Sequence, residues 1–155
     1  MKVVLVSCVK TKLKLNSNQK VKAKELYTST LFKEAWIYSQ QLKADKTYIL
    51  SAKYGLLNPE TKIGTYNETL NDKKACEIRK WGTMVLKQMN EEGLDTKRDT
   101  FILLAGQNYC KGILKSTKQP NGIENFKMPY KENHLKGNGY IVQFLQRKNK
   151  HIYDR

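Results

Sequence analysis

Three apolar runs, each bounded by polar residues, alternate along the chain with segments of helical periodicity. The runs at 2–6, 48–50 and 100–105 are rich in Val, Ile and Leu and show no alternation of polar and apolar positions. Such runs are typical of strands that are buried on both faces of a parallel sheet. We therefore expect three central strands, a turn at 120–122 and a short edge strand within 123–128.

The segments between these runs carry apolar residues at helical spacing. After Thr30, which can cap a helix, the spaced residues are Leu31, Phe32, Ala35, Ser39 and Leu42. After Asn71, a second candidate cap, steps of three and four join Ala75, Ile78, Gly82, Val85 and Met89, and Gly93 closes the segment. Further helices are predicted over 108–116 and 138–148.

Strands and helices therefore alternate from the beginning to the end of the sequence. This order is typical of an α/β fold, in which right-handed crossovers place helices on both faces of a mostly parallel sheet. The chain has 155 residues and shows no internal repeat or linker. We expect residues 1–155 to form a single three-layer domain around a four-stranded sheet.

Small and polar residues follow each of the three predicted central strands. Ser7 and Cys8 follow the first, Ser51 and Lys53 the second, and 106–108 the third. Ligands of open α/β sheets collect outside the carboxyl ends of the strands. We expect a shared ligand pocket at this edge, although turns alone also favour small residues there.

Basic and aromatic side chains lie close to these strand ends in the sequence. Three lysines are candidates for holding phosphate, unless they are solvated surface residues: Lys10, Lys12 and Lys53. Four tyrosines are candidates for stacking on a base or bonding a sugar, unless they are core residues: Tyr27, Tyr54, Tyr66 and Tyr109. We add Ser29, beside Tyr27, and Gly106, which precedes a helix N-terminus that favours anions.

Two residues in this region are candidates for chemistry on a bound ligand. Cys8 is a possible nucleophile or a buried structural thiol, and no histidine lies near it in sequence. Glu68, in the long segment 58–70, is a candidate general acid or base, or a surface carboxylate. The cysteines and histidines show no metal-ligand spacing, so we expect no metal and no cofactor. The three single cysteines are expected to be reduced thiols.

The net charge points to an anionic partner. Lys and Arg number 29 against 14 Asp and Glu, which gives a formal charge of +15. Such an excess favours nucleic acid first and an anionic small molecule, such as a nucleotide, second. The apolar run at the beginning of the chain is too short for a signal-peptide core, and no run is long enough to span a membrane. We therefore expect a cytoplasmic protein without membrane contact.

Ordered blocks over about two-thirds of the chain resemble the YaaA-like family of small bacterial and phage proteins. The blocks are residues 5–12, 25–32, 48–57, 66–70 and 104–106 with Tyr109. The resemblance implies an α/β domain associated with DNA and mobile elements. It also implies a distant likeness to the uracil-DNA-glycosylase fold and to enzymes that modify bases.

Residues 106–109, Gly-Gln-Asn-Tyr, echo the motif with which those glycosylases activate water. Here Asn108 replaces the aspartate and Cys110 the histidine, so the amide can position a water but cannot take its proton. The hypothesis is N-glycosidic chemistry in which Ser51, Glu68 and Asn108 handle the sugar and the water. The alternatives are a non-catalytic DNA- or RNA-binding module, and a mobile-element protein whose basic surface binds an acidic protein.

Overall fold

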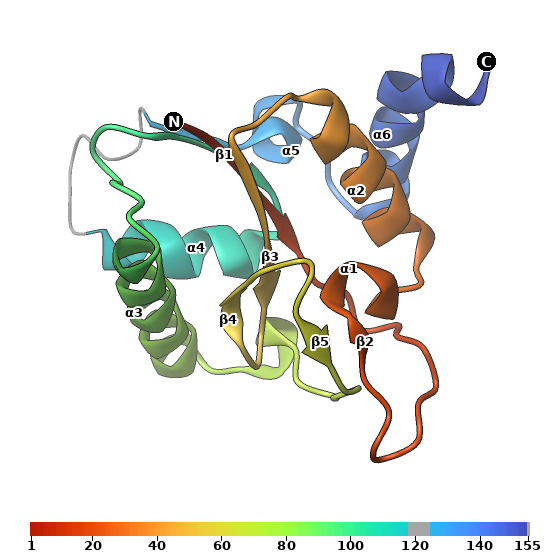
Figure 1. The fold of residues 1–155 in the computed structure, drawn as a ribbon. Coiled ribbons are helices and arrows are strands. Elements are labelled where there is room, and N and C mark those ends of the chain that lie inside the picture. Colours follow the sequence, from red (N-terminus) through yellow and green to blue (C-terminus); the bar gives the residue numbers. More distant parts are fainter. Residues whose placement is uncertain (118–124, 155) are drawn as a thin grey trace.

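The computed structural model describes residues 1–117 and 125–154, and a five-stranded sheet lies at its centre (Figure 1). In spatial order its strands are β4 (Gly55–Leu57), β3 (Lys46–Ser51), β1 (Lys2–Ser7), β6 (Thr100–Leu104) and β7 (Phe126–Lys127). All neighbouring pairs are parallel except β3 and β4. The mostly parallel sheet expected from the sequence is confirmed. Residues 120–124, which include the predicted turn, lie outside the described residues.

The central strand β1 explains why the apolar runs show no alternation. It pairs with β3 on one side and with β6 on the other, and Val3 to Val6 have no exposed surface. Both faces of such a strand are covered, so every position needs an apolar side chain. The carboxyl ends of the three strands consequently lie side by side.

Helices cover both faces of the sheet (Figure 1). On one face α2 (Thr30–Gln41) packs against α6 (Asn138–Tyr153), with the one-turn α5 (Pro129–Glu132) nearby. On the other face α3 (Ala75–Glu91) packs against α4 (Gln107–Ser116). These layers confirm the three-layer α/β architecture. The last helix extends beyond its predicted end at residue 148.

The fifth strand, β4, was not predicted from the sequence. Gly55 begins it with φ +74°, a left-handed conformation that favours glycine, and pairs with Ser51 of β3. The Gln88 side chain of α3 holds this turn from outside: its Oε1 accepts from the Leu56 N–H at 2.8 Å and its Nε2 donates to the Tyr54 carbonyl at 2.9 Å. The local pattern of residues indicates the turn but not the strand that follows it.

Two of the predicted helix caps are wrong by a few residues. The Ser29 hydroxyl, and not Thr30, caps α2 by accepting from the Phe32 N–H at 3.1 Å. Asn71 belongs to the short 3₁₀-helix η1 (Leu70–Asp72), and α3 begins only at Ala75. The reason is that the chain makes an extra turn before α3, which places η1 beside the first residues of α4.

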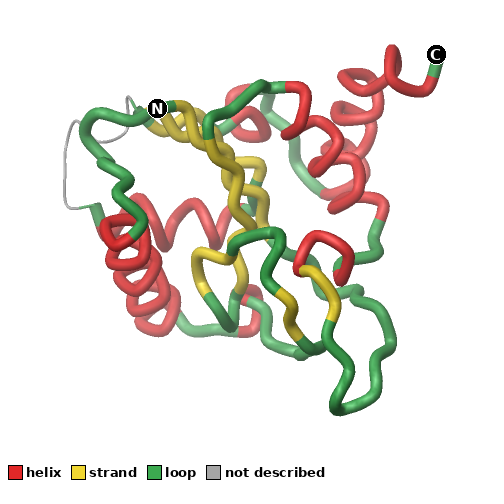
Figure 2. Tube along the Cα trace, viewed as in Figure 1, coloured by secondary structure: helices red, strands yellow, loops and turns green. Residues whose placement is uncertain are grey.

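A small outlying ribbon joins residues 21–22 to part of the segment 58–70, which was predicted as a long loop. Strand β2 (Val21–Lys22) pairs antiparallel with β5 (Lys62–Ile63), and α1 (Ala23–Leu26) follows β2. Glu60 holds the ribbon together through ion pairs with Lys22 at 3.1 Å and Lys24 at 2.5 Å. Figure 2 shows that long loops surround this ribbon at the carboxyl end of the sheet.

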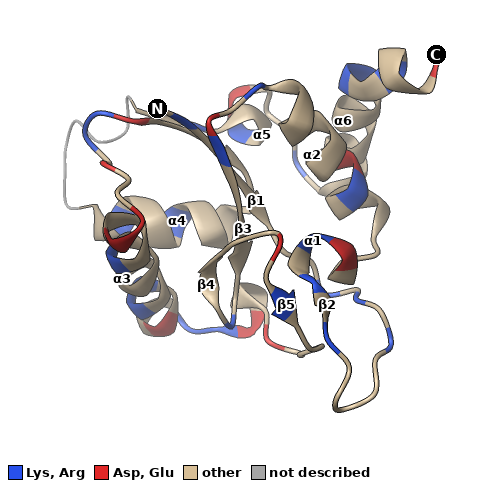
Figure 3. Cartoon of the chain, viewed as in Figure 1, with Lys and Arg blue, Asp and Glu red and all other residues tan. Residues whose placement is uncertain are grey.

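Basic residues are distributed over most of the fold. Figure 3 shows Lys and Arg on α3, α4, α6, β2 and β5, as well as on the loop that follows β1. The excess charge therefore surrounds the molecule instead of marking one face. None of the described helices combines the length and the apolar character needed to cross a membrane.

Candidate functional site

A cavity of about 250 Å³ lies at the carboxyl ends of β1 and β6. Its wall is formed by the residues after β1, the first turns of α2, α4 and α6, η1 and α5. The polar residues and glycine in that wall are Ser7, Cys8, Lys10, Thr69, Asn71, Asp72, Gly106, Tyr109, Tyr130 and Asn138. This is the position at which open α/β sheets bind their ligands.

Cys8 and Tyr109 form a polar pair in the wall of this cavity. Cys8 Sγ lies 3.2 Å from Tyr109 Oη, and both side chains are about 95 per cent buried. Trp81 supports the tyrosine ring edge-on, with ring centres 5.4 Å apart. Burial, and then the neighbouring thiol, raise the pKa of Tyr109 well above its ordinary value. The hydroxyl therefore stays protonated at neutral pH and is available as a hydrogen-bond donor.

Two of the three helices that begin at the cavity have no side-chain cap. Gly106 precedes α4 and Gly137 precedes α6, and neither glycine has a side chain that could accept a hydrogen bond from the first N–H groups of its helix. Uncapped N–H groups and the helix dipole favour an anion at such ends. Lys10 adds a formal positive charge to the same wall, and Asp72 adds a negative one. The cavity thus offers N–H donors, a cation and one carboxylate acceptor.

A chain of buried hydroxyl groups lies next to the cavity. Tyr66 Oη lies 2.8 Å from Ser51 Oγ and 2.5 Å from Tyr27 Oη. Ser51 is fully buried, and its hydroxyl also accepts from the N–H groups of Lys53 and Tyr54. The pKa values of Tyr27 and Tyr66 are both raised, mainly because the hydroxyls are buried and secondly because the Cys8 thiol is nearby. These hydroxyls fasten the end of β3 to the loop after β5.

Two lysine ammonium groups lie over the rings of this tyrosine cluster. Lys12 Nζ is 4.4 Å from the centre of the Tyr66 ring, and Lys53 Nζ is 5.3 Å from the centre of the Tyr54 ring. Tyr54 in turn meets Tyr66 edge-on, with ring centres 5.7 Å apart. Lys12 is half-buried and Lys53 is exposed. Both contacts are cation–π interactions, which are stronger where water is excluded.

The structure divides the predicted ligand-binding residues between three places. One group lines the cavity: Ser7, Cys8, Lys10, Gly106 and Tyr109. A second group forms the adjoining tyrosine cluster: Lys12, Tyr27, Lys53, Tyr54 and Tyr66. Ser29 stands apart from both as the cap of α2. The ends of β1 and β6 thus share one cavity, whereas Ser51 and Lys53 at the end of β3 belong to the adjoining tyrosine cluster.

The three predicted catalytic residues do not meet around one point. Ser51 is buried, with its hydroxyl engaged by Tyr66 and two backbone N–H groups. Glu68 is exposed in a separate, more open hollow of about 270 Å³ beside Trp81. Asn108 donates from Nδ2 to Asn71 Oδ1 at 2.9 Å, so it orients a residue of the cavity wall.

Several residues of the cavity wall were not identified from the sequence. They come from η1, α5 and the start of α6, and they include Thr69, Asn71, Asp72, Tyr130 and Asn138. Among the described residues, the Tyr130 hydroxyl is the buried side-chain polar atom without a hydrogen-bond partner. In the sequence, Pro129 indicates the start of a helix, and the glycines on either side of Asn138 indicate a turn. Neither pattern shows that these segments lie beside the ends of β1 and β6.

No group of three or more His, Cys, Asp or Glu within 1–117 and 125–154 is arranged to hold a metal ion. Cys8 and Cys110 are buried, Cys76 is exposed, and all three are free thiols. Both histidines are exposed and lie on the C-terminal part of the chain. The donors at the cavity are instead hydroxyl, amide and amine groups, which suit an organic or phosphate-bearing ligand.

Comparison with known proteins identifies a family. The model of a family of unknown function, DUF6884, matches residues 3–138. No curated protein and no solved structure matches the chain. The relationship to YaaA-like and glycosylase-like proteins therefore stays a prediction. The matched segment contains β1, β3, β6 and the cavity wall as far as Asn138. Because the match covers most of the sequence, the chain belongs to the DUF6884 family.

Proposed function

We propose that the cavity at the ends of β1 and β6 recognises a nucleotide, or one nucleotide unit of a nucleic acid. One observation carries this proposal. Two helix N-termini without side-chain caps, at Gly106 and Asn138, lie at the same cavity as Lys10. Backbone N–H groups at helix N-termini, together with a lysine, form a common phosphate-binding arrangement.

The rest of the wall suits the other parts of a nucleotide. Asn71 and Asp72 offer acceptors for sugar hydroxyls, and a carboxylate plays this part for ribose in other α/β sites. Phe32 and Tyr109 offer apolar ring surface near the thiol of Cys8. Pockets for drug-sized ligands usually measure about 300–1,000 Å³. A cavity of about 250 Å³ therefore suits a single nucleotide unit better than a dinucleotide.

The arrangement supports recognition more directly than catalysis. The residues expected to carry N-glycosidic chemistry do not gather at the cavity, because Glu68 lies in a different hollow and the Ser51 hydroxyl is engaged by Tyr66. Asn108 reaches the wall through Asn71. We therefore propose a nucleic-acid-associated domain whose main role is binding. The test below also measures whether the protein releases a base.

The test measures binding of wild-type protein to a labelled duplex, a single strand and a nucleoside monophosphate at two salt concentrations. Lys10→Ala removes the cation of the cavity wall. Lys14→Ala is the matched control, because Lys14 is exposed on the same loop and does not line the cavity. We expect Lys10→Ala to weaken mononucleotide binding by roughly tenfold to a hundredfold, in line with a lost charge-assisted hydrogen bond of about 1.5–3 kcal/mol. Lys14→Ala should leave this binding unchanged.

Each result has a distinct meaning. Equal losses in the two variants would show that binding follows general charge, with a log–log salt slope of about −0.9 for each duplex phosphate contacted. Absence of binding to all three ligands would contradict the proposal. Analysis of the reaction mixture for free base adds the catalytic test. Base release that disappears in Asn108→Ala or Glu68→Ala would identify an enzyme.

A further inference from the structure

The segment that follows the end of β1 carries a dense positive charge. We call residues 10–24 the basic arm; they contain no Asp or Glu and six lysines, namely Lys10, Lys12, Lys14, Lys20, Lys22 and Lys24. Their formal charge is therefore +6. In comparison, α3 has three basic and two acidic residues, which gives +1, and α6 has three basic residues and no Asp or Glu, which gives +3. Basic residues occur over most of the fold, but the arm concentrates them more than these two long helices do.

Hydrogen bonds hold the arm in one shape. Near its start, the Leu13 N–H donates to the Leu26 carbonyl at 2.8 Å. At its tip, the Gln19 N–H donates to the Asn16 carbonyl at 3.0 Å, and Gln19 Oε1 accepts from the Asn16 N–H at 2.8 Å. The arm then continues into β2, which pairs with β5. A surface that is already ordered loses less conformational entropy when a partner binds to it.

Three ammonium groups of the arm are exposed and take part in no ion pair. Glu60 neutralises the two lysines nearest to it, in β2 and α1. In the part of the chain that the structure describes, none of the ion pairs includes Lys10, Lys14 or Lys20. All three are exposed. An anionic partner can therefore reach these lysines without first breaking an ion pair.

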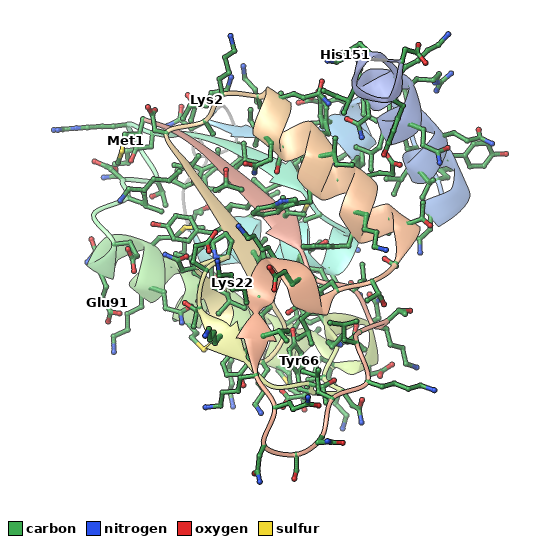
Figure 4. The ribbon with its side chains drawn as sticks, turned by 45° about the vertical axis from the view of Figure 1, so that its right-hand side comes forward. Met1, Lys2, Lys22, Tyr66, Glu91 and His151 are labelled. Atoms are coloured by element: carbon green, nitrogen blue, oxygen red, sulfur yellow. The ribbon has the colours of Figure 1, made fainter. Side chains whose placement is uncertain are left out.

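The arm adjoins the cavity proposed for the nucleotide unit. Lys10, its first residue, lines that cavity. Figure 1 shows the following loop projecting beyond β2 and β5. Figure 4 shows Tyr66 and this loop at the end of the molecule opposite Met1 and Lys2, which is the side of the carboxyl ends of the strands. The cavity and the arm thus belong to the same side of the sheet.

We propose that the basic arm binds the backbone phosphates of a single-stranded nucleic acid beside the unit that occupies the cavity. This inference rests on the proposed function and adds the surface that holds the rest of the strand. A base must leave its stack and its paired strand to enter a pocket, so the adjoining segment is single-stranded. The lysines meet phosphates, and the amide and hydroxyl groups of residues 16–19 suit phosphate and sugar oxygens.

The composition of the arm favours nucleic acid over an acidic protein. Interfaces between proteins are depleted in lysine and enriched in aromatic residues. The arm has six lysines and no aromatic residue. Contacts with phosphates depend on positive charge alone and do not need an apolar centre.

The experiment compares two double variants. Lys14→Ala with Lys20→Ala removes two charges from the arm. Lys87→Ala with Lys115→Ala is the matched control, because these lysines are exposed on α3 and α4 and line neither the cavity nor the second hollow. Fluorescence anisotropy measures binding of each protein to a nucleoside monophosphate and to a labelled single strand of about ten nucleotides, within the usual site size.

The expected result is a smaller salt dependence in the arm variant. Each phosphate contact with a single strand contributes about 0.7 to the log–log salt slope, so two lost contacts lower it by about 1.4. When the salt rises from about 50 to about 200 mM, wild type should lose about sevenfold more strand affinity than the arm variant does. The control variant should behave as wild type, and mononucleotide binding should be unchanged in both variants.

Lysine acetylation of the wild-type protein tests the same contact without any substitution. A bound strand should protect Lys14 and Lys20 several-fold more than Lys87 and Lys115, as mapped by peptide mass spectrometry. Equal protection of all four lysines would overturn the inference.

The outcomes separate the arm from the cavity. If mononucleotide binding depends on Lys10 but strand binding is equal in the two double variants, the proposed function stands and the inference on the arm fails. If strand binding depends on the arm and no mononucleotide binds, the arm is supported and the proposed role of the cavity is contradicted. Polyglutamate is added as a competitor at equal charge. Arm-dependent binding of polyglutamate as tight as that of the strand would assign the arm to an acidic protein and overturn the inference.

Discussion

Asn149 of α6 donates from Nδ2 to the Glu34 carboxylate of α2 at 2.7 Å, across the contact between the two helices. The same amide group donates to the Glu34 backbone carbonyl at 2.9 Å, and Tyr153 donates to the other carboxylate oxygen at 2.6 Å. Asn149 is fully buried and Glu34 is nearly so. The family match ends at residue 138, where α6 begins, so this contact attaches a helix that lies outside the match.

Replacing Asn149 by alanine should destabilise the protein by about 1–3 kcal/mol, the usual cost of leaving a buried polar partner unsatisfied. The Glu34 carboxylate would lose its buried donor and would keep only the Tyr153 hydroxyl, near the surface. Urea denaturation measures the loss. Gln146→Ala is the control, because Gln146 is exposed on the same helix. A loss as large in Gln146→Ala would show that α6 is sensitive to any substitution.

Gly82 and Gly112 set the distance between α3 and α4. A Cβ added to Gly82 would lie 1.9 Å from the Gly112 carbonyl oxygen, so the two helices would have to separate. Gly82→Ala should therefore cost about 1–3 kcal/mol of stability or more, as overpacking of a core does. Gly139→Ala on α6 should be neutral or slightly stabilising, because nothing lies within 4 Å of its added Cβ and alanine favours helix. Thermal unfolding of the two variants compares them directly.

The Tyr66 hydroxyl joins two buried partners, Ser51 and Tyr27, and Tyr66→Phe removes it without changing the ring. We expect a loss of about 1–3 kcal/mol in the free energy of unfolding, since both partners lose a bond in a buried place. Tyr140→Phe is the matched control on an exposed ring of α6. A stability equal to wild type would contradict the view that this hydroxyl fastens β3 to the loop.

Cys110 makes the stability of the fold depend on pH in the alkaline range. Burial raises the pKa of its thiol from 9.0 to about 11, so the folded protein keeps a proton that the unfolded chain releases. The protonated Cys110 thiol therefore makes its full contribution to the free energy of unfolding below pH 9, and this contribution is lost as the pH rises towards 11. Over this pH range, the free energy of unfolding of wild type should fall by up to about 3 kcal/mol more than that of Cys110→Ala.

Denaturation of wild type and Cys110→Ala, each measured below pH 9 and near pH 11, checks this expectation. The packing lost in the variant is the same at both pH values and cancels in the comparison. Parallel curves for the two proteins would mean that the thiol titrates as it does in an unfolded chain. The tyrosines, which also titrate in this range, are present in both proteins.

The sequence was sufficient for features that depend on local pattern. The apolar runs around Val4, Ile49 and Leu103 lack alternation because both faces of those strands are covered, and this pattern alone predicts a parallel sheet. Parallel strands place their carboxyl ends together, so the neighbourhood of Cys8, Ser51 and Gly106 also follows from the pattern. The helix positions followed from spacing, with caps misplaced by one to three residues.

Tertiary structure decided which side chains share a cavity. Strand β4 is too short to show a pattern of polar and apolar positions. It forms because the chain reverses at Gly55, which pairs with Ser51, and because the Gln88 side chain of α3 accepts a hydrogen bond from the next residue. Tyr130 and Asn138 reach the cavity because α5 and α6 pack on the same face as α2. Glu68 lies outside this cavity and lines the separate hollow beside Trp81.

The same distinction holds for the chemistry of single residues. From the sequence alone, Lys12 is distinguished only by its charge, because its neighbours Thr11 and Leu13 indicate no particular environment. Its contact with the rings of Tyr27 and Tyr66 joins residues 15 and 54 positions away in the chain. A pattern along the sequence encodes which residues are covered, because burial repeats with the period of the element. It does not encode which distant side chains meet, because that depends on how the covered elements pack together.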